Sequence, residues 1–260
     1  MTILDEIAAF TRLRVKEAKA KLPLSELKKI TADLGPKEFA FKKALSASGV
    51  SLICECKKAS PSKGLISPDY PYLKIAKDYC AGGADAISVL TEPKWFLGKS
   101  EHLKEIALSV NAPCLRKDFT IDEYMIYEAR ALGADAVLLI TSLLSSSQLK
   151  EYLGITHSLG LSALVESHGE DELRAAIESG AEIIGVNNRN LKDFSVDSSN
   201  SLKLRSLVPS GVLFVSESGV KGPKDIAKLK EFNVDAALVG ETLMRSSGRE
   251  AAVRALKEKA

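Results

Sequence analysis

The 260-residue sequence lacks a long hydrophobic run, an excess of either charge and a large share of aromatic side chains. No window approaches the ~18 apolar residues of a membrane span, so we expect no membrane partner. Lys and Arg number 36 against 34 Asp and Glu, a formal charge of +2, whereas nucleic-acid and membrane-surface binders need a concentrated basic face. Aromatic residues make up 6% of the chain and do not alternate with basic runs, which argues against stacking on nucleic-acid bases.

Cysteine is also scarce, and its spacing is not that of a metal site. The four cysteines, at positions 54, 56, 80 and 114, show no CxxC pattern with a neighbouring histidine. We expect reduced, mostly buried thiols in a cytoplasmic protein, and Asp5 and Glu6 near the start are unlike a secretory signal. Glycine-rich nucleotide fingerprints and a Ser-His-Asp elbow are absent too, so we expect neither a metal nor an organic cofactor.

Short β-branched runs alternate with amphipathic stretches after residue 48, each run separated from the next by room for one helix. The predicted strands are Val50–Cys56, Asp85–Leu90, Pro113–Lys117, Asp135–Thr141, Ser162–Ser167, Glu182–Asn187, Val212–Ser216 and Asp235–Gly240. Continuously apolar runs are typical of strands buried on both faces, and strands that alternate with helices form parallel sheets. Eight units predict an α/β fold, a single (β/α)8 TIM barrel, over residues 48–260. An open doubly wound sheet is disfavoured because CKKASPSK, not a glycine-rich loop, follows the first strand.

An internal repeat supports the barrel. The segments GGADAISVL, LGADAVLLI, SGAEIIGVN and FNVDAALVG each place an acidic residue before an apolar run, and three place a glycine where a helix would end. Residues 1–47 do not join the repeat and read as charged amphipathic helices, an N-terminal extension of the same domain. The sequence leaves open whether this extension closes the lower end of the barrel or covers its mouth.

The first strand carries an acid and a base on one face. Side chains alternate along a strand, so Glu55 and Lys57 share a face with Ile53, opposite Cys54 and Cys56. The apolar set must meet the helices, which points Glu55 and Lys57 toward the barrel axis. Unpaired charges buried there would cost several kcal/mol each, so we expect a functional pair, with a structural ion pair as the alternative.

Other strand ends deliver polar groups to the same mouth, where barrels of this kind carry their chemistry. Parity places Lys117 inward on the third strand and Glu166 inward on the fifth, and puts Asn187 and Arg189 on one side of the sixth. On the seventh strand, parity does not decide whether Glu217 or Ser218 points inward. None of the histidines has a carboxylate at ligand spacing. His168 follows the fifth strand, where a place at the mouth is the alternative, but we favour a surface role for it.

The last two strands end in glycine-containing segments that suit a phosphate group. Ser218-Gly219 and Gly240-Glu241-Thr242 follow strands seven and eight, the usual phosphate site of this fold. Glycine lets the backbone approach an anion, and a helix N-terminus offers free N–H groups. The segment Ser60–Gly64 after the first strand is a candidate cationic lid, and Trp95–Gly98, which includes Phe96, is a candidate apolar wall.

At these residues the chain resembles a known family. The segments that carry the resemblance are LICECKKASPSKG (52–64), LRKDF (115–119), LVES (164–167), IGVNNRNL (184–191), SESGV (216–220) and LVGETLM (238–244). They are similar, in order across residues 48 to 245, to indole-3-glycerol-phosphate synthase of tryptophan biosynthesis. That family closes the ring of 1-(2-carboxyphenylamino)-1-deoxyribulose 5-phosphate with release of CO₂ and water. The resemblance implies a small phosphorylated substrate and an association with other enzymes of the pathway.

The resemblance also implies catalytic roles. Lys117 would be the general acid that protonates the ribulose carbonyl, and Lys57 would contact the anthranilate carboxylate and help the later dehydration. Glu55 and Glu166 would be acid/base or electrostatic partners, and which of them is the base stays open. Asn187 and Glu217 would orient the substrate.

For binding, the resemblance gives Arg189 a contact with the phosphate or a part in holding the mouth together. It implies that the phosphate site is lined by Ser60, Ser218, Gly219, Gly240 and Glu241. Phe96 would face the anthranilate ring.

Two alternatives remain at this stage. One is a phosphoribosylanthranilate isomerase-like barrel, whose chemistry typically uses a cysteine at the end of strand one; Cys54 and Cys56 are predicted to face outward, which argues against it. The other is a non-catalytic binder of phosphorylated metabolites, which would not need the inward acid/base set of Glu55, Lys117 and Glu166.

Overall fold

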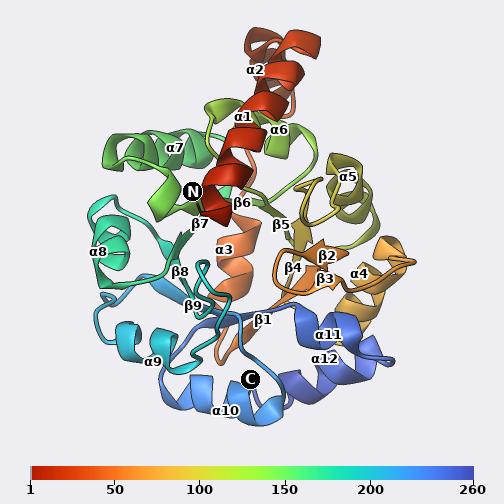
Figure 1. The fold of residues 1–260 in the computed structure, drawn as a ribbon, viewed down its shortest axis with the longest axis vertical. Helices are drawn as coiled ribbons and strands as arrows, with labels where there is room; N and C mark the ends of the chain where they lie inside the picture. The colour runs from red at the N-terminus through yellow and green to blue at the C-terminus, as the bar shows by residue number, and fades with distance from the viewer. Residues whose placement is uncertain (1) are drawn as a thin grey trace.

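Eight parallel strands close into a barrel surrounded by helices (Figure 1). The computed structural model describes residues 2–260. The barrel strands are β1 (Ser51–Cys56), β4 (Ala86–Leu90), β5 (Cys114–Lys117), β6 (Ala136–Ile140), β7 (Ser162–Ser167), β8 (Ile183–Asn187), β9 (Leu213–Glu217) and β10 (Ala236–Val239). Each strand pairs in parallel with the next along the chain, and β10 pairs with β1 to complete the ring. The predicted (β/α)8 barrel is confirmed, and every strand boundary lies within one residue of its prediction.

Helices fill the connections between strands. The outer helices are α4 (Tyr72–Ala81), α5 (Ser100–Ser109), α6 (Glu123–Ala131), α7 (Ser146–Ser158), α8 (Glu170–Glu178), α9 (Ser199–Arg205), α10 (Pro223–Glu231) and α12 (Arg249–Lys257). Smaller elements near the mouth are the hairpin β2 (Ala59–Ser60) and β3 (Gly64–Leu65), the 3-10 turn η1 (Thr141–Leu143) and the short helix α11 (Glu241–Arg245). No helix within residues 2–260 is long and apolar enough to cross a membrane.

The repeated acidic residue has a structural explanation. The side chains of Asp85, Asp135 and Asp235 each accept a hydrogen bond from a backbone N–H at the start of the preceding strand, at 2.7–2.9 Å. These bonds fix the register between neighbouring strands at the lower end of the barrel. The repeated glycines end the outer helices with positive φ, as predicted, and they are Gly83, Gly133 and Gly180.

The strands separate two apolar layers. Leu52, Cys54 and Cys56 point outward into the layer beneath the helices, while Ile53 points inward to the barrel axis. The outward cysteines are fully buried, and that burial raises the pKa of both thiols above the ordinary value. The parity that was predicted for the first strand is therefore correct.

The N-terminal extension comprises α1 (Ile3–Lys21), α2 (Leu24–Asp33) and α3 (Ala40–Leu45). Helix α3 closes the lower end: Phe41 and Leu45 are fully buried against inward-facing strand residues, and the Lys42 N–H donates to Ser162 at the start of β7. Helix α1 instead supplies Ile3, Leu4 and Ile7 to the cavity at the opposite end. Different helices of the extension thus occupy the two positions that the sequence left open.

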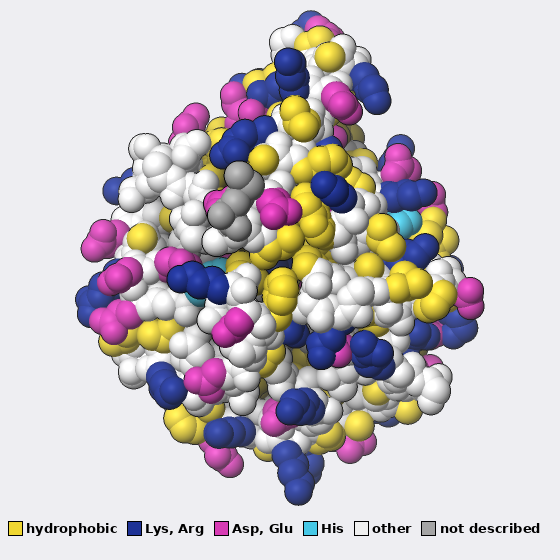
Figure 2. All heavy atoms as spheres, in the orientation of Figure 1, with side chains coloured by type: hydrophobic (Ala, Val, Ile, Leu, Met, Phe, Trp, Pro, Cys, Tyr) yellow, Lys and Arg dark blue, Asp and Glu magenta, His cyan; other side chains and the backbone are white. Residues whose placement is uncertain are grey.

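In the space-filling view, apolar side chains gather along α1 toward the centre of the face, and charged side chains dominate the outer rim (Figure 2). Helices α1 and α2 project beyond the ring of outer helices (Figure 1).

Candidate active site

A cavity of about 570 Å³ lies at the carboxyl ends of the strands. It brings together all of the residues predicted for the site: Glu55, Lys57, Ser60, Phe96, Lys117, Glu166, Asn187, Arg189, Glu217, Ser218, Gly219, Gly240 and Glu241. These residues come from every part of the chain after residue 50, so the barrel fold alone makes them neighbours. No group of three or more His, Cys, Asp or Glu side chains in residues 2–260 is arranged to hold a metal ion.

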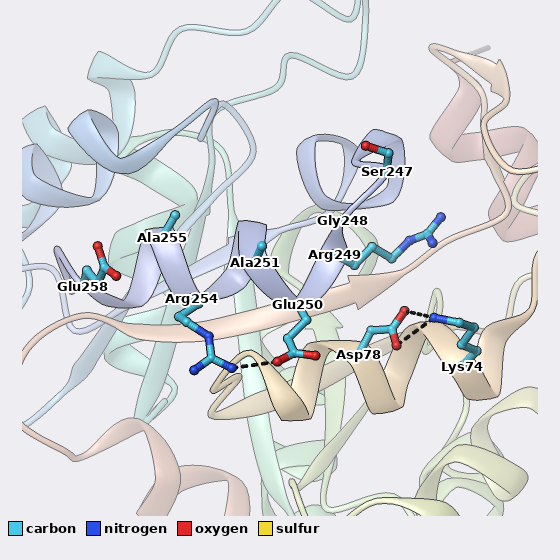
Figure 3. A pocket seen from close by; sticks show the side chains of 10 residues that line it. All are labelled: Lys74, Asp78, Ser247, Gly248, Arg249, Glu250, Ala251, Arg254, Ala255 and Glu258. Carbon is cyan, nitrogen blue, oxygen red and sulfur yellow. Dashed lines mark hydrogen bonds and ion pairs between the residues drawn. The ribbon is translucent and has the colours of Figure 1, made fainter.

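A second hollow, of about 480 Å³, lies on the outer surface where α12 passes α4 (Figure 3). Four of its charged side chains are paired within their helices, Lys74 with Asp78 and Arg254 with Glu250. It contains none of the strand-end residues, so we do not connect it with the chemistry of the mouth.

Glu55 and Lys57 form the first of two Lys–carboxylate groups that inward-facing strand residues place in the cavity. Lys57 Nζ lies 2.5 Å from Glu55 Oε1, and both side chains are largely buried. Gly240, at the end of β10, makes room for the pair, because a Cβ at that position would overlap Glu55 Oε1. A glycine predicted only as part of a phosphate site thus also shapes the acid/base pair.

Lys117 forms the second group, in contact with two carboxylates. Its Nζ lies 2.7 Å from Glu166 Oε2 and 3.3 Å from Glu217 Oε2, and both glutamates are almost fully buried. The sequence did not decide which side chain at the end of β9 points inward, and the structure shows that Glu217 does. Gly185 on β8 makes this possible because a side chain there would overlap Glu217 Oε1; sequence reasoning missed this glycine within an apolar strand.

Burial and charge give the two glutamates different protonation states. Burial raises the pKa of Glu217 to about 8, because the nearby Lys117 only partly offsets it and Glu166 adds repulsion. Burial acts on Glu166 in the same direction, but Lys117, His168 and the Asn187 amide outweigh it and lower its pKa to about 2. Near neutral pH, Glu166 is therefore a carboxylate and Glu217 a neutral acid.

The same balance keeps Lys117 charged. Burial alone would lower its pKa, yet the attraction of Glu166, Glu217 and Glu55 raises the pKa above the ordinary value. Glu217 Oε1 is buried and has no hydrogen-bond partner within residues 2–260. Protonation removes the charge that an unpartnered, buried carboxylate oxygen would otherwise carry.

Asn187 links this group to the glycine-rich corner. Its side-chain N–H donates to Glu166 Oε1 at 3.0 Å, which fixes the amide orientation. Its Oδ1 then accepts from Ser218 Oγ and from the Arg189 backbone N–H, each at 3.0 Å. Asn187 thereby positions the residue that begins the candidate phosphate site.

That corner has the backbone geometry of an anion site. Ser218 and Gly219 have φ values of 65° and 95°, so both lie in the left-handed region. The Glu241 carboxylate is surrounded by cations: Arg245 at 3.2 Å, Lys63 at 3.5 Å and Arg189 at 3.8 Å. The cluster holds positive charge at the rim of the cavity, with Lys63 supplied by the loop predicted as a cationic lid.

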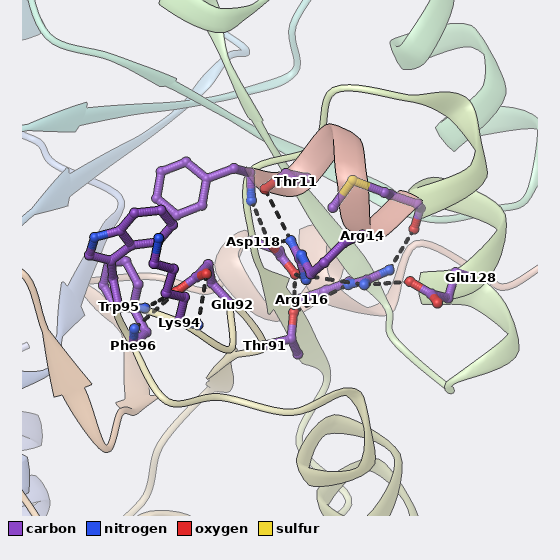
Figure 4. A network of polar contacts seen from close by, with 12 residues as sticks. Thr11, Arg14, Thr91, Glu92, Lys94, Trp95, Phe96, Arg116, Asp118 and Glu128 are labelled. Atoms are coloured by element: carbon purple, nitrogen blue, oxygen red, sulfur yellow. Dashed lines mark hydrogen bonds and ion pairs between the residues drawn. The ribbon is translucent and has the colours of Figure 1, made fainter. Parts of the chain in front are cut away.

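The two aromatic residues of the predicted apolar wall lie in different places, one in the cavity and one against α1. Phe96 lines the cavity beside Phe119, with ring centroids 5.9 Å apart, whereas Trp95 packs edge-on against Phe10 of α1. Glu92, fully buried, accepts the backbone N–H groups of residues 94, 95 and 96 at 2.7–3.0 Å and so fixes this loop (Figure 4). Sequence reasoning missed Glu92, although an acid directly after a strand was a usable signal.

A buried network beside Lys117 was also missed. Asp118, which follows Lys117, accepts two hydrogen bonds from Arg14 of α1 at 2.7 and 3.1 Å and one from Thr91 at 2.6 Å (Figure 4). Arg116 points away from the cavity and pairs with Glu128 on α6. The end of β5 is therefore held by an arginine more than a hundred residues distant in sequence.

The surface role expected for His168 is wrong. Its side chain is 19% exposed, and its Nε2 lies 3.4 Å from Glu166 Oε1. His168 directly follows β7, and its hydrogen bond to Glu172 on α8 holds the imidazole beside Glu166 instead of leaving it in solvent.

Comparison with known proteins gives a consistent result. A sequence model described as indole-3-glycerol phosphate synthase matches residues 4–256. The protein of that name from Ruminiclostridium cellulolyticum is 54% identical over 256 residues, covering 98% of this chain and 98% of its own length. The one from Endomicrobium trichonymphae is 54% identical over 257 residues, covering 98% and 100%.

More distant solved structures share the fold. The crystal structure of KGPDC from Streptococcus mutans superposes with a TM-score of 0.63 at 14% identity, covering 82% of this chain and 97% of that one. Thiamine phosphate pyrophosphorylase from Pyrococcus furiosus gives 0.59 at 16% identity, covering 80% and 94%. At this identity the likeness concerns the barrel alone.

Proposed function

The chain belongs to the indole-3-glycerol phosphate synthase family, and from this premise we propose how its side chains carry out the reaction. The activity is a carboxy-lyase step of tryptophan biosynthesis: ring closure of 1-(2-carboxyphenylamino)-1-deoxyribulose 5-phosphate with loss of CO₂ and water. The observation that most supports the residue roles is the buried Lys117–Glu166 pair beside a neutral Glu217. Cys54 and Cys56 pack beneath the outer helices, away from the cavity, which leaves the isomerase alternative without support.

The substrate carries negative charge at both ends, so it needs two cationic or N–H-rich regions. The phosphate would bind at the corner formed by Ser218, Gly219 and Gly240, where left-handed backbone and glycine allow close approach. Arg189 and Lys63, now held by Glu241, would add positive charge there. The anthranilate carboxylate would then lie near Lys57, with its ring against Phe96.

The first bond forms between an aromatic carbon and the ribulose carbonyl carbon. As the carbon attacks, Lys117 donates its proton to the carbonyl oxygen, which becomes a hydroxyl group. Loss of CO₂ then returns the bonding electrons to the ring and restores its neutrality. Asn187 and protonated Glu217 would orient the ribulose hydroxyls by hydrogen bonds.

Dehydration completes the indole ring. The leaving hydroxyl must be protonated and a ring proton removed, and we assign these tasks to Lys57 and Glu55, which lie in contact. Glu166 is the weaker candidate for the base, because ion pairs and hydrogen bonds engage both of its oxygens and lower its pKa. Within residues 2–260, the Glu55 carboxylate accepts a side-chain hydrogen bond from Lys57 through Oε1. Its second oxygen therefore remains available to accept the ring proton.

Further proposals concern the setting. We propose that residues 1–47 and the barrel form one domain, since α3 completes the apolar interior. We also propose a cytoplasmic location, in keeping with the buried free thiols, and an association with neighbouring enzymes of the pathway. Co-purification with those enzymes from the native cell would test the association.

The purified protein is expected to convert the carboxyphenylamino-deoxyribulose phosphate to an indole product without added metal. The proposed steps need only proton donors and acceptors, which Lys117, Lys57 and Glu55 provide. Indole fluorescence follows the turnover, and the same assay after dialysis against EDTA is the control. Absent turnover, or turnover lost to EDTA and restored by a metal, would contradict the proposal.

The pH dependence should reveal Glu217. Its pKa of about 8 means that the neutral donor form predominates below that pH and is lost above it. We expect kcat to fall as pH rises through this value, and Glu217→Gln, which keeps an N–H donor at all pH values, to lose that decline while retaining measurable activity. Glu217→Ala is the matched comparison and should be slower than the Gln variant; equal rates would show that the donor is not used.

A further inference from the structure

His168 occupies an unusual place between two carboxylates, one inside the cavity and one outside it. It stands between β7 and α8, where Glu172 Oε2 accepts both its backbone N–H, at 2.9 Å, and its ring Nδ1, at 3.1 Å. Thr141 of η1 lies 3.0 Å from the same oxygen. The backbone N–H and ring Nδ1 of His168 thus both donate to Glu172, which fixes the ring plane and requires a proton on Nδ1.

The other ring nitrogen faces the catalytic group. Nε2 is buried, has no hydrogen-bond partner within residues 2–260, and lies 3.4 Å from Glu166 Oε1. With Nδ1 protonated, a neutral ring would place the lone pair of Nε2 close to a carboxylate oxygen, which is repulsive. The imidazolium form instead places an N–H there, so the geometry favours a charged His168.

The charged groups around the ring agree with this assignment. Glu172 on α8, Glu166 on β7 and Glu217 on β9 face it, and Lys117 on β5 is the cation on the far side of Glu166. Burial alone would lower the pKa of His168, but the Glu172 hydrogen bond and the attraction of Glu166 outweigh burial and raise it. Asn200 of α9 contributes only a neutral hydrogen bond to the His168 carbonyl oxygen.

A charged His168 matters at the moment when Lys117 loses its proton. Glu166 would then be a buried carboxylate without its lysine partner, a state that costs several kcal/mol. We infer that His168, oriented by Glu172, is a positioning residue that keeps Glu166 compensated while Lys117 donates its proton. The inference depends on the proposed role of Lys117 and adds to it a partner on the opposite oxygen of Glu166.

Kinetics of His168→Gln provide the first test. Glutamine retains an N–H donor but not the charge, so we expect kcat to fall about tenfold with little change in KM. The ratio of wild-type to variant kcat should shrink as pH rises through the pKa of His168, because the wild type then loses the same charge; the Glu217 ionisation is common to both and cancels. His157→Gln, at a histidine on α7 remote from the cavity, is the control and should match the wild type.

A direct titration separates this inference from the proposed function. The ring signals of His168, assigned by their absence in His168→Gln, should titrate in NMR spectra above the ordinary pKa of about 6.5, and Glu172→Gln should lower that pKa. A normal or lowered pKa in the wild type, or a kcat ratio independent of pH, would overturn the inference even if the synthase assay succeeds. Absent synthase activity with a raised pKa that Glu172→Gln lowers would instead count against the proposed function; the inferred role in proton donation would then fall with it, leaving only the charge assignment.

Discussion

Replacing Lys117 with alanine is expected to lower kcat by at least ~10² without unfolding the protein. Lys117 is the cation placed between Glu166 and Glu217, and both acids favour its protonated form. A donor held in that form can release its proton only to a substrate oxygen whose negative charge develops in the transition state. Alanine removes both the proton and the charge, so no other group in the cavity replaces it directly.

The measurement is steady-state kinetics by indole fluorescence, with circular dichroism to verify the fold. Lys117→Arg separates the two contributions, since a guanidinium keeps the charge but is a very weak acid. We expect it to remain nearly as slow as the alanine variant while KM stays closer to that of the wild type. Lys104→Ala, at an exposed lysine on α5, is the matched control and should leave kcat unchanged.

A near-wild-type kcat for Lys117→Ala would remove Lys117 as the general acid. Lys57, the other lysine that an inward-facing strand position brings into the cavity, would then be the next candidate to protonate the carbonyl. An active Lys117→Arg variant would show that charge, not proton donation, is what the site requires from this position.

The barrel was predictable because its signals are local. Each strand is a short apolar run, and the acidic residue before several of these runs proved to fix strand register through backbone hydrogen bonds, as Asp85 does. Alternation alone placed Glu55 and Lys57 inside, because the opposite face was apolar and had to meet the helices. On β9 the polar run Ser216–Ser218 gave no such contrast, so its parity needed the structure.

The surroundings of the site were less predictable because they join distant segments. Nothing near Asp118 in the sequence indicates Arg14, which reaches it from α1. His168 depends in the same way on the turn that brings Glu172 beneath it. Sequence reasoning found the groups that point into the cavity and missed those that hold them in place.

The contact between Arg14 and Asp118 leads to the second large prediction. Asp118→Ala is expected to lower the free energy of unfolding by about 3 kcal/mol, because it leaves the largely buried Arg14 without its ion-pair partner. The Asp118 side chain is fully buried and is bonded to Arg14 and Thr91, with Arg116 3.7 Å away. Urea unfolding at neutral pH measures the loss, and Arg174→Ala, which breaks an exposed pair on α8, is the control expected within about 0.5 kcal/mol of the wild type.

Lowering the pH should reduce the difference in unfolding free energy between the wild type and Asp118→Ala. Burial would raise the pKa of Asp118, but Arg14 and Arg116 outweigh burial and lower it. A lowered carboxyl pKa contributes stability that is present above the unfolded-state pKa and is lost as pH falls through the folded-state pKa. The difference between wild type and Asp118→Ala should therefore be largest near neutral pH and decrease in strong acid; a difference that does not change with pH would mean that shape, and not the charge of Asp118, holds α1 against the end of β5.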